Sequence, residues 1–285
     1  MPAARPVCCL VLFLVASLSA AAEERIVAIG GAVTEIVFAL GAGDRLVAVD
    51  STSSHPPAAK DLPDVGYLRR LAPEPIIALA PSIVLALEDA GPPAVLDQLR
   101  AAGVPLVIVP DAPTPDSVID KVRVVAEALG RVEEGNSLMA RLASDFAALT
   151  EAPRSPESPR VLLLLAVSAS GAPLVGGEGT SADAIIRLAG ARNAAAGVVG
   201  YKPLAPEAVV ALAPDVLLIP DRGLELLGGR DRLLSRPEIA PTPAGQAGRI
   251  VTMDQLLLLG FGPRTPEAAQ QLSERLTSRL AGALP

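Results

Sequence analysis

Aromatic residues and histidine are both scarce in this 285-residue chain, which holds four Phe, two Tyr, no Trp and a single His. Nucleic-acid-binding proteins use a basic surface and stacking rings, whereas this chain has a formal net charge of −7 and only 2% aromatic residues. One histidine also excludes a metal site with two imidazole ligands, and it leaves one candidate base for a Ser-His-Asp triad. The composition therefore argues against a nucleic-acid partner.

The balance of apolar and charged residues is that of a folded protein. Hydrophobic residues make up 51% of the chain and charged residues 19%, which excludes a disordered chain. A length of 285 residues suits one large domain or two smaller ones.

The first 22 residues have the features of a secretory signal peptide. Arg5 supplies a positive charge, residues 7–19 are apolar, and small residues lead to a cleavage site near Ala22. A membrane anchor is the alternative, but the apolar run is shorter than the roughly 20 residues that a spanning helix needs. Both cysteines lie in this segment, so the exported chain has no disulfide framework. We therefore expect an exported protein.

Short apolar runs alternate with longer segments of helical spacing along the rest of the chain. The runs that predict buried strands are 25–29, 45–50, 82–87 and 105–110, then 160–167, 172–176, 215–220 and 249–253. This alternation is typical of parallel βα units. We predict an α/β fold with two Rossmann-like lobes built on parallel sheets, an N-terminal lobe over residues 23–113 and a C-terminal lobe over 151–285.

The segment that joins the lobes, residues 114–150, has apolar residues close to the 3.6-residue period of a helix. Thr114 suits an N-cap and Pro115 the first helical position. We predict one long connecting helix that holds the two lobes at a nearly fixed angle. Two successive helices are the alternative, because Gly130 and Gly135 are positions at which a helix can bend or break.

An internal repeat is the strongest local signal. The sequence LAPEPIIALAPSIVL at 71–85 aligns without a gap with LAPEAVVALAPDVLL at 204–218, with nine of fifteen positions identical. Each copy follows a Gly-Tyr pair and a basic residue. The two lobes therefore share local topology, which places a ligand between them, at the carboxyl ends of the strands.

Four segments carry a resemblance to a known family: DSTSSHP (50–56), VGYLR (65–69), EDAGPP (88–93) and LLGFGPRTPEAA (258–269). The chain resembles the periplasmic substrate-binding proteins of haem (hemin) ABC importers, in which one rigid helix joins two α/β lobes. The resemblance extends over residues 25–269. It implies haem as the transported ligand, an ABC permease as partner, an outer-membrane haem receptor system upstream, and a monomer. Cobalamin or a ferric siderophore is the alternative ligand, because binders of both share this architecture.

The resemblance also implies an iron ligand. In the family, the residue before the proline of the D-x-T-S-x-x-P-like loop is generally a tyrosine whose phenolate ligates haem iron, and here that residue is His55. A neutral imidazole nitrogen serves equally as an axial ligand, so we predict His55 as the haem ligand and metal-binding residue. Its alternative role is that of an ordinary loop residue. Tyr67 and Tyr201 are the fallback ligands, or they contact the porphyrin or a propionate.

Further haem contacts follow from the resemblance. Arg222 comes directly after a predicted strand and is expected near the iron ligand or the haem. Arg69 and Lys202 are candidate partners for the haem propionates, because carboxylates need charged donors. Met253 and the apolar run 256–261 are candidates for a wall against the porphyrin face. The alternatives are a solvated surface position for the three basic residues and a core position for the apolar ones.

Glu74 and Glu207 occupy matching positions in the two copies of the repeat. An acid in the first turn of a helix is stabilised by the helix dipole and needs no function. In the resembled family, however, such a pair docks onto basic pockets of the membrane permease. We predict that role for both residues.

An exported hydrolase or lyase is the competing class of function, with Glu88 and Asp89 as its candidate carboxylates. The sequence contains no nucleophile elbow and no phosphate-binding loop, and its glycine-rich stretches match dinucleotide motifs only loosely. The sequence therefore favours a non-catalytic binding protein.

Overall fold

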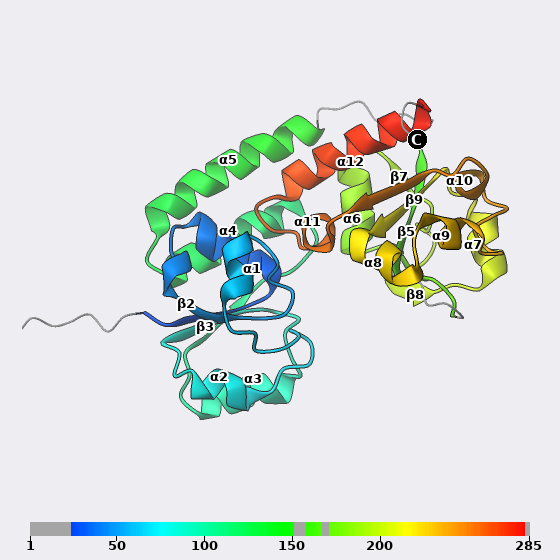
Figure 1. Ribbon diagram of the computed structural model, residues 1–285. Coiled ribbons are helices and arrows are strands. Elements are labelled where there is room, and N and C mark those ends of the chain that lie inside the picture. The colour runs from blue at the N-terminus through cyan, green and yellow to red at the C-terminus, as the bar shows by residue number, and fades with distance from the viewer. Residues whose placement is uncertain (1–23, 151–157, 167–170, 283–285) are drawn as a thin grey trace, which may run out of the picture.

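The computed structural model describes residues 24–150, 158–166 and 171–282, and it shows two α/β lobes (Figure 1). The predicted fold class, an α/β protein with two lobes, is confirmed. The predicted signal peptide, residues 1–22, lies outside the described residues.

The N-terminal lobe is built on a parallel four-stranded sheet in the order β2-β1-β3-β4. Its strands, all four of them predicted, are β1 (Ile26–Ile29), β2 (Leu46–Val49), β3 (Ile83–Leu87) and β4 (Leu106–Val109). Its helices are α1 (Gly31–Ala39), α2 (Pro73–Ala78), α3 (Pro93–Ala101) and α4 (Pro115–Ala128), with short 3₁₀ turns at Gly43–Arg45 and Pro57–Asp61. Strand β1 is fully buried at the centre of the sheet, as its unbroken apolar run requires.

The C-terminal lobe contains a six-stranded sheet in the order β10-β9-β5-β6-β8, with β7 paired to β5. Its strands are β5 (Arg160–Ala166), β6 (Leu174–Gly176), β7 (Arg192–Asn193), β8 (Tyr201–Pro203), β9 (Val216–Pro220) and β10 (Ile250–Met253). Its helices are α6 (Ser181–Leu188), α7 (Pro206–Leu212), α8 (Asp221–Leu227), α9 (Arg230–Leu234), α10 (Pro243–Gln246), α11 (Gln255–Leu259) and α12 (Thr265–Leu280). The predicted parallel sheet is present as β10, β9, β5 and β7. Strands β6 and β8 extend it, and β6 pairs antiparallel with both β5 and β8.

The prediction of one continuous helix over 114–150 is wrong. The segment forms two helices, α4 (Pro115–Ala128) and α5 (Val132–Thr150), which pack against each other. Thr114 is the N-cap of α4, as predicted, and its hydroxyl accepts a hydrogen bond from the Ser117 amide at 3.1 Å. The alternative of two successive helices is the one that the structure shows.

Two glycines explain why the connection folds back. Gly130 has a φ of +63°, the left-handed conformation that ends helices. The following amide, that of Arg131, bonds the Ala126 carbonyl at 2.8 Å and closes the turn. Gly135 on α5 then lies against Ala126 on α4 so closely that a Cβ atom there would collide with the alanine side chain. The close packing of the two helices therefore requires glycine at that position.

Helices α5 and α12 run together along one side of both lobes (Figure 1). One hydrophobic cluster of buried residues extends from the N-terminal sheet through these helices into the C-terminal lobe, and it includes Ile26, Leu142, Leu163 and Leu272. The lobes are therefore joined by shared core as well as by the chain. No helix in the described part of the chain has the length and apolar character needed to span a membrane.

The sequence repeat adopts the same local structure in both lobes. In the first copy α2 leads into β3, and in the second α7 leads into β9. Ala80 and Ala213, which are equivalent in the repeat, both have left-handed backbone, with φ of +45° and +42°. The repeat therefore reflects a shared helix-turn-strand unit, as predicted.

Candidate ligand-binding cleft

Polar loops follow the carboxyl ends of the N-terminal strands β2 and β3. The loop after β2 is organised by Asp50, which is 1% exposed and accepts hydrogen bonds from the Gly30 amide at 2.9 Å and the Ser53 hydroxyl at 2.9 Å. The Thr52 amide donates to the same carboxylate at 3.1 Å. Much of the DSTSS segment is thus structural, and it holds His55 at a fixed point of the loop.

His55 is half-buried on the loop after β2. Its charge is one of the smaller influences that lower the pKa of Glu35, and burial outweighs it. Glu35 lies on α1 and forms an ion pair with Arg264, which precedes α12: Nη2 to Oε1 is 2.5 Å and Nε to Oε2 is 3.1 Å. This ion pair crosses from one lobe to the other.

Tyr67 and Arg69 form the most developed polar arrangement at the cleft. The Arg69 Nη1 atom donates a hydrogen bond to the Tyr67 hydroxyl at 2.7 Å, and Nη2 of the same guanidinium pairs with Asp89 Oδ2. The guanidinium of Arg70 also lies 5.7 Å from the centre of the Tyr67 ring. Positive charge beside a phenol oxygen stabilises negative charge on that oxygen.

The C-terminal lobe contributes α8, which begins directly after β9 and faces the N-terminal lobe (Figure 1). Arg222 is exposed in its first turn and makes no ion pair with another described residue. Leu226 lies one turn further along the same face and is 78% exposed. An apolar side chain so exposed beside a free guanidinium suits a ligand with an apolar face and an anionic edge. Sequence reasoning missed Leu226, because the helix itself was not predicted.

Tyr201 and Lys202 lie on β8, at the edge of the C-terminal sheet. The Tyr201 hydroxyl is 2.8 Å from the Ser181 hydroxyl, and its ring packs on Gly176. Lys202 is exposed and has no ion-pair partner among the described residues.

Several residues expected to form an apolar wall against a ligand lie in the core instead. Met253 is 1% exposed and packs in the core, so it is not available to a porphyrin. Leu258 and Phe261 are buried as well. Leu256 instead packs on Gly31 of the N-terminal lobe, close to the carbonyl of Thr52. Part of the run 256–261 therefore helps to join the lobes.

These contacts belong to a seam between the lobes, which we define as α1 and α4 on one side and residues 256–264 on the other. Gly262 approaches Ala32 and Glu35 so closely that a Cβ atom there would lie 3.2 Å from Glu35 Oε2. Lys121, which is 0% exposed, bonds both Asp111 Oδ1 at 2.6 Å and the Phe261 carbonyl at 3.1 Å. The lobes are therefore tied by two buried charges in addition to α5.

Sequence reasoning missed the charged members of the seam, although a signal for them was present. Glu35 and Lys121 both stand on faces of predicted helices that are otherwise apolar. A charge in such a position is costly unless it is paired, which is a reason to look for a partner. The partners lie far away in sequence, since Glu35 and Arg264 are 229 positions apart.

The seam leads us to expect a rigid molecule. We predict that the apo and hemin-loaded forms have nearly the same radius of gyration by small-angle scattering, because closing a wide hinge would break the buried ion pairs. Replacing Lys121 and Arg264 together with alanine removes both ties and is expected to enlarge the difference. A large compaction of the wild type on adding hemin would contradict the account of the seam.

The pKa of Glu35 is raised above its ordinary value of 4.5, mainly by burial, although the hydrogen bond and charge of Arg264 lower it. A raised carboxyl pKa means that the folded protein binds the proton more tightly than the unfolded chain, so this group favours folding more as the pH falls. We therefore expect the free energy of unfolding of the wild type, relative to Glu35→Gln, to rise between neutral pH and 4.5. Urea unfolding across that range measures it. The exposed Glu127→Gln variant is the control, and a constant difference for Glu35→Gln would refute the prediction.

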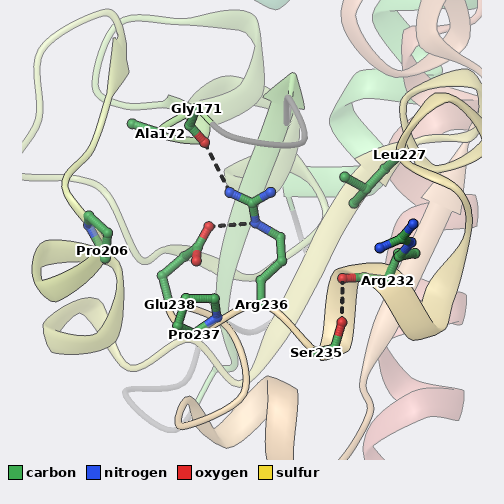
Figure 2. A pocket seen from close by; sticks show the side chains of 9 residues that line it. All are labelled: Gly171, Ala172, Pro206, Leu227, Arg232, Ser235, Arg236, Pro237 and Glu238. Atoms are coloured by element: carbon green, nitrogen blue, oxygen red, sulfur yellow. Dashed lines mark hydrogen bonds and ion pairs between the residues drawn. The ribbon is translucent and has the colours of Figure 1, made fainter.

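A separate pocket of about 610 Å³ lies within the C-terminal lobe, and Figure 2 shows the residues that line it. Its main polar groups are already paired: Arg236 Nε is 2.5 Å from Glu238 Oε1, and Nη2 donates to the Gly171 carbonyl at 2.9 Å. All of the lining residues come from one lobe. The pocket is therefore distinct from the cleft between the lobes.

Glu74 and Glu207 are both exposed in the first turns of α2 and α7. Neither carboxylate has an ion-pair partner among the described residues. Both are thus available to an external partner, one from each lobe.

The structure shows two α/β lobes with a core shared between them and polar loops at the strand ends of the N-terminal lobe. The sequence model of the periplasmic binding protein family matches residues 26–257, and the chain belongs to that family.

Solved structures narrow the similarity within the family. The chain is 46% identical to the periplasmic heme-binding protein RhuT from Roseiflexus sp. RS-1, with 90% of this chain and 99% of that chain covered and a TM-score of 0.86. It is 44% identical to the periplasmic heme-binding protein BhuT in complex with two hemes, with the same coverage and a TM-score of 0.85. It is also 26% identical to the vitamin B12-binding protein of Pectobacterium carotovorum, over 98% of this chain and 97% of that protein.

Proposed function

We propose that this protein binds haem in the periplasm and delivers it to an ABC importer for haem and iron uptake. The observation that carries the proposal is the Tyr67 hydroxyl, which accepts a hydrogen bond from Arg69 at 2.7 Å in the N-terminal lobe. The C-terminal lobe adds an exposed Arg222 and an exposed Leu226 on α8. These groups match a ferric iron, two propionates and a flat apolar ring. The similarity to heme-binding proteins at 44–46% identity supports the same ligand.

Tyr67 is the iron ligand in this proposal. Its oxygen accepts a hydrogen bond from a charged donor and its ring lies near two guanidinium groups, a setting suited to an oxygen ligand of ferric haem. The sequence-based assignment of His55 stays a prediction, supported by its position on the loop after β2 and tested by the same variants. Tyr201 is a weaker candidate, because its hydroxyl is already bonded to Ser181.

The C-terminal lobe supplies the propionate partners and the apolar contact. Arg222 and Lys202 are exposed cations without ion-pair partners among the described residues, so we assign them to the propionates. Leu226 takes the place of Met253 as the residue that packs on the porphyrin face. Arg69 is bonded to Tyr67 and Asp89. We therefore assign Arg69 to the oxygen of the iron ligand Tyr67 and not to a propionate.

The remaining assignments follow from transport. Glu74 and Glu207 dock on the permease, residues 1–22 direct export as a signal peptide cleaved near Ala22, and an outer-membrane receptor system supplies haem to a monomeric carrier. The protein has no catalytic role in this scheme. Of the two carboxylates considered for a hydrolase, Asp89 is paired with Arg69.

Ligand-dependent thermal stabilisation tests the choice between haem and cobalamin. A ligand that binds only the folded chain increases the free energy of unfolding, by about 2.7 kcal/mol when its concentration is a hundred times Kd. The melting temperature therefore rises. We expect hemin to produce such a shift and cyanocobalamin to produce none. A shift with cyanocobalamin alone would overturn the proposal in favour of the vitamin B12-binding relatives.

A further inference from the structure

Asp89 is placed beside Arg69 by the backbone. It lies on the loop after β3, and backbone hydrogen bonds connect that loop to the loop that carries Tyr67. The Gly91 amide bonds the Leu68 carbonyl at 2.8 Å, and the Leu71 amide bonds the Gly91 carbonyl at 2.9 Å. The carboxylate therefore has a fixed position relative to the guanidinium.

The three side chains form a continuous chain of contacts. Arg69 donates to the Tyr67 hydroxyl through Nη1 and pairs with Asp89 through Nη2. The Arg69 side chain is 54% exposed, so without an anchor it would sample many rotamers in solvent. The Asp89 carboxylate is the group that selects the rotamer in which the guanidinium reaches the phenol oxygen.

The structure keeps Asp89 at this point at some cost to stability. Its Oδ1 atom is buried and has no hydrogen-bond partner within the described part of the chain. A buried acceptor without a partner is destabilising. Its charge also adds to the effect of burial in raising the pKa of the neighbouring Asp111. The partner that the structure does show for the Asp89 carboxylate is Arg69, through Oδ2, so its contact leads to Tyr67.

We propose that Asp89 is a positioning residue for haem binding, which acts through Arg69 to hold the guanidinium on the oxygen of the iron ligand Tyr67. This inference rests on the proposed function and deepens it. Asp89 itself touches neither the iron nor the porphyrin in this scheme. Removing Asp89 weakens the bond between Tyr67 and the iron, because Arg69 loses its fixed orientation.

Asp89→Asn tests the role with little change in shape. We expect hemin to dissociate about tenfold faster, which corresponds to about 1.4 kcal/mol, and the charge-transfer band of the ferric complex to shift. The matched control is Glu88→Gln, because Glu88 is the adjacent carboxylate, is exposed, and makes no side-chain bond to another described residue. It removes the same charge and is expected to leave both readouts unchanged. Asp89→Ser replaces Asp89→Asn if the latter fails to fold.

A double-mutant cycle separates a positioning role from a general one. If Asp89 acts only through Arg69, removing Arg69 also removes whatever Asp89 contributes. The double variant Arg69→Ala/Asp89→Asn should then release hemin no faster than Arg69→Ala alone. Additive effects, or an Asp89→Asn variant that behaves like Glu88→Gln, would overturn the inference. Absence of saturable hemin binding by the wild type would overturn the proposed function, whereas failure of Asp89→Asn alone leaves that function intact.

Discussion

Tyr67→Phe is expected to weaken hemin binding by at least about tenfold, or about 1.4 kcal/mol, and to abolish the phenolate-to-iron charge-transfer band. The variant keeps the aromatic ring and loses only the oxygen that Arg69 holds at 2.7 Å. The measurement is an equilibrium titration of the apo protein with hemin, followed at the Soret band and in the visible region.

His55→Ala is the companion variant, because His55 is the ligand that the sequence predicts. If Tyr67 ligates the iron, His55→Ala retains the phenolate band and loses affinity only modestly. If instead His55→Ala removes the binding and Tyr67→Phe retains it, the ligand is His55, and the assignment of Tyr67 is wrong. Tyr201→Phe serves as the control, since its hydroxyl is bonded to Ser181.

Replacing Glu74 and Glu207 together with alanine is expected to reduce haem import by at least about tenfold while hemin binding by the purified protein stays normal. Each carboxylate is exposed in the first turn of a short helix, one on each lobe. A single exposed ion pair contributes only about 0.2–1 kcal/mol. Two pairs on a rigid frame act together, because the first contact raises the effective concentration of the second. Either single variant should therefore show a smaller loss.

The matched control for docking is Asp116→Ala. Asp116 is likewise an exposed acid that follows a proline in the first turn of a helix, but it has no counterpart in the repeat. Import into vesicles that contain the permease is the assay. Wild-type import by the double variant, or poor hemin binding by it, would show that these residues do not act in docking.

The sequence predicted the elements whose signals are local. All eight predicted strands are present, and Thr114 caps its helix, because apolar runs and capping residues act over a few positions. Strand β8 was missed, since it is three residues long, ends in proline and exists only through its antiparallel pairing with β6. The single connecting helix was wrong because helical periodicity continues across Gly130, whose left-handed backbone reverses the chain.

The candidate site was predictable only in part for the same reason. Tyr67 and Arg69 are two positions apart, so the sequence could place them together, and the resemblance pointed to both. Their link to Asp89 depends on how two loops pair, and the link of Glu35 to Arg264 depends on how two lobes meet. A local sequence pattern predicts neither of these two contacts. Met253 shows the converse, because an apolar residue at a strand end serves a core as readily as a ligand.

The most direct test of haem binding is a spectroscopic titration of the purified apo protein with hemin. The account predicts a saturable shift of the Soret band together with the visible bands of a ferric complex that has an oxygen ligand. In Tyr67→Phe the oxygen-ligand bands should be lost and the Soret titration should saturate only at about tenfold higher hemin concentration or more, whereas Glu88→Gln should retain both changes. A wild-type spectrum that is only the sum of free hemin and apo protein would contradict the central claim.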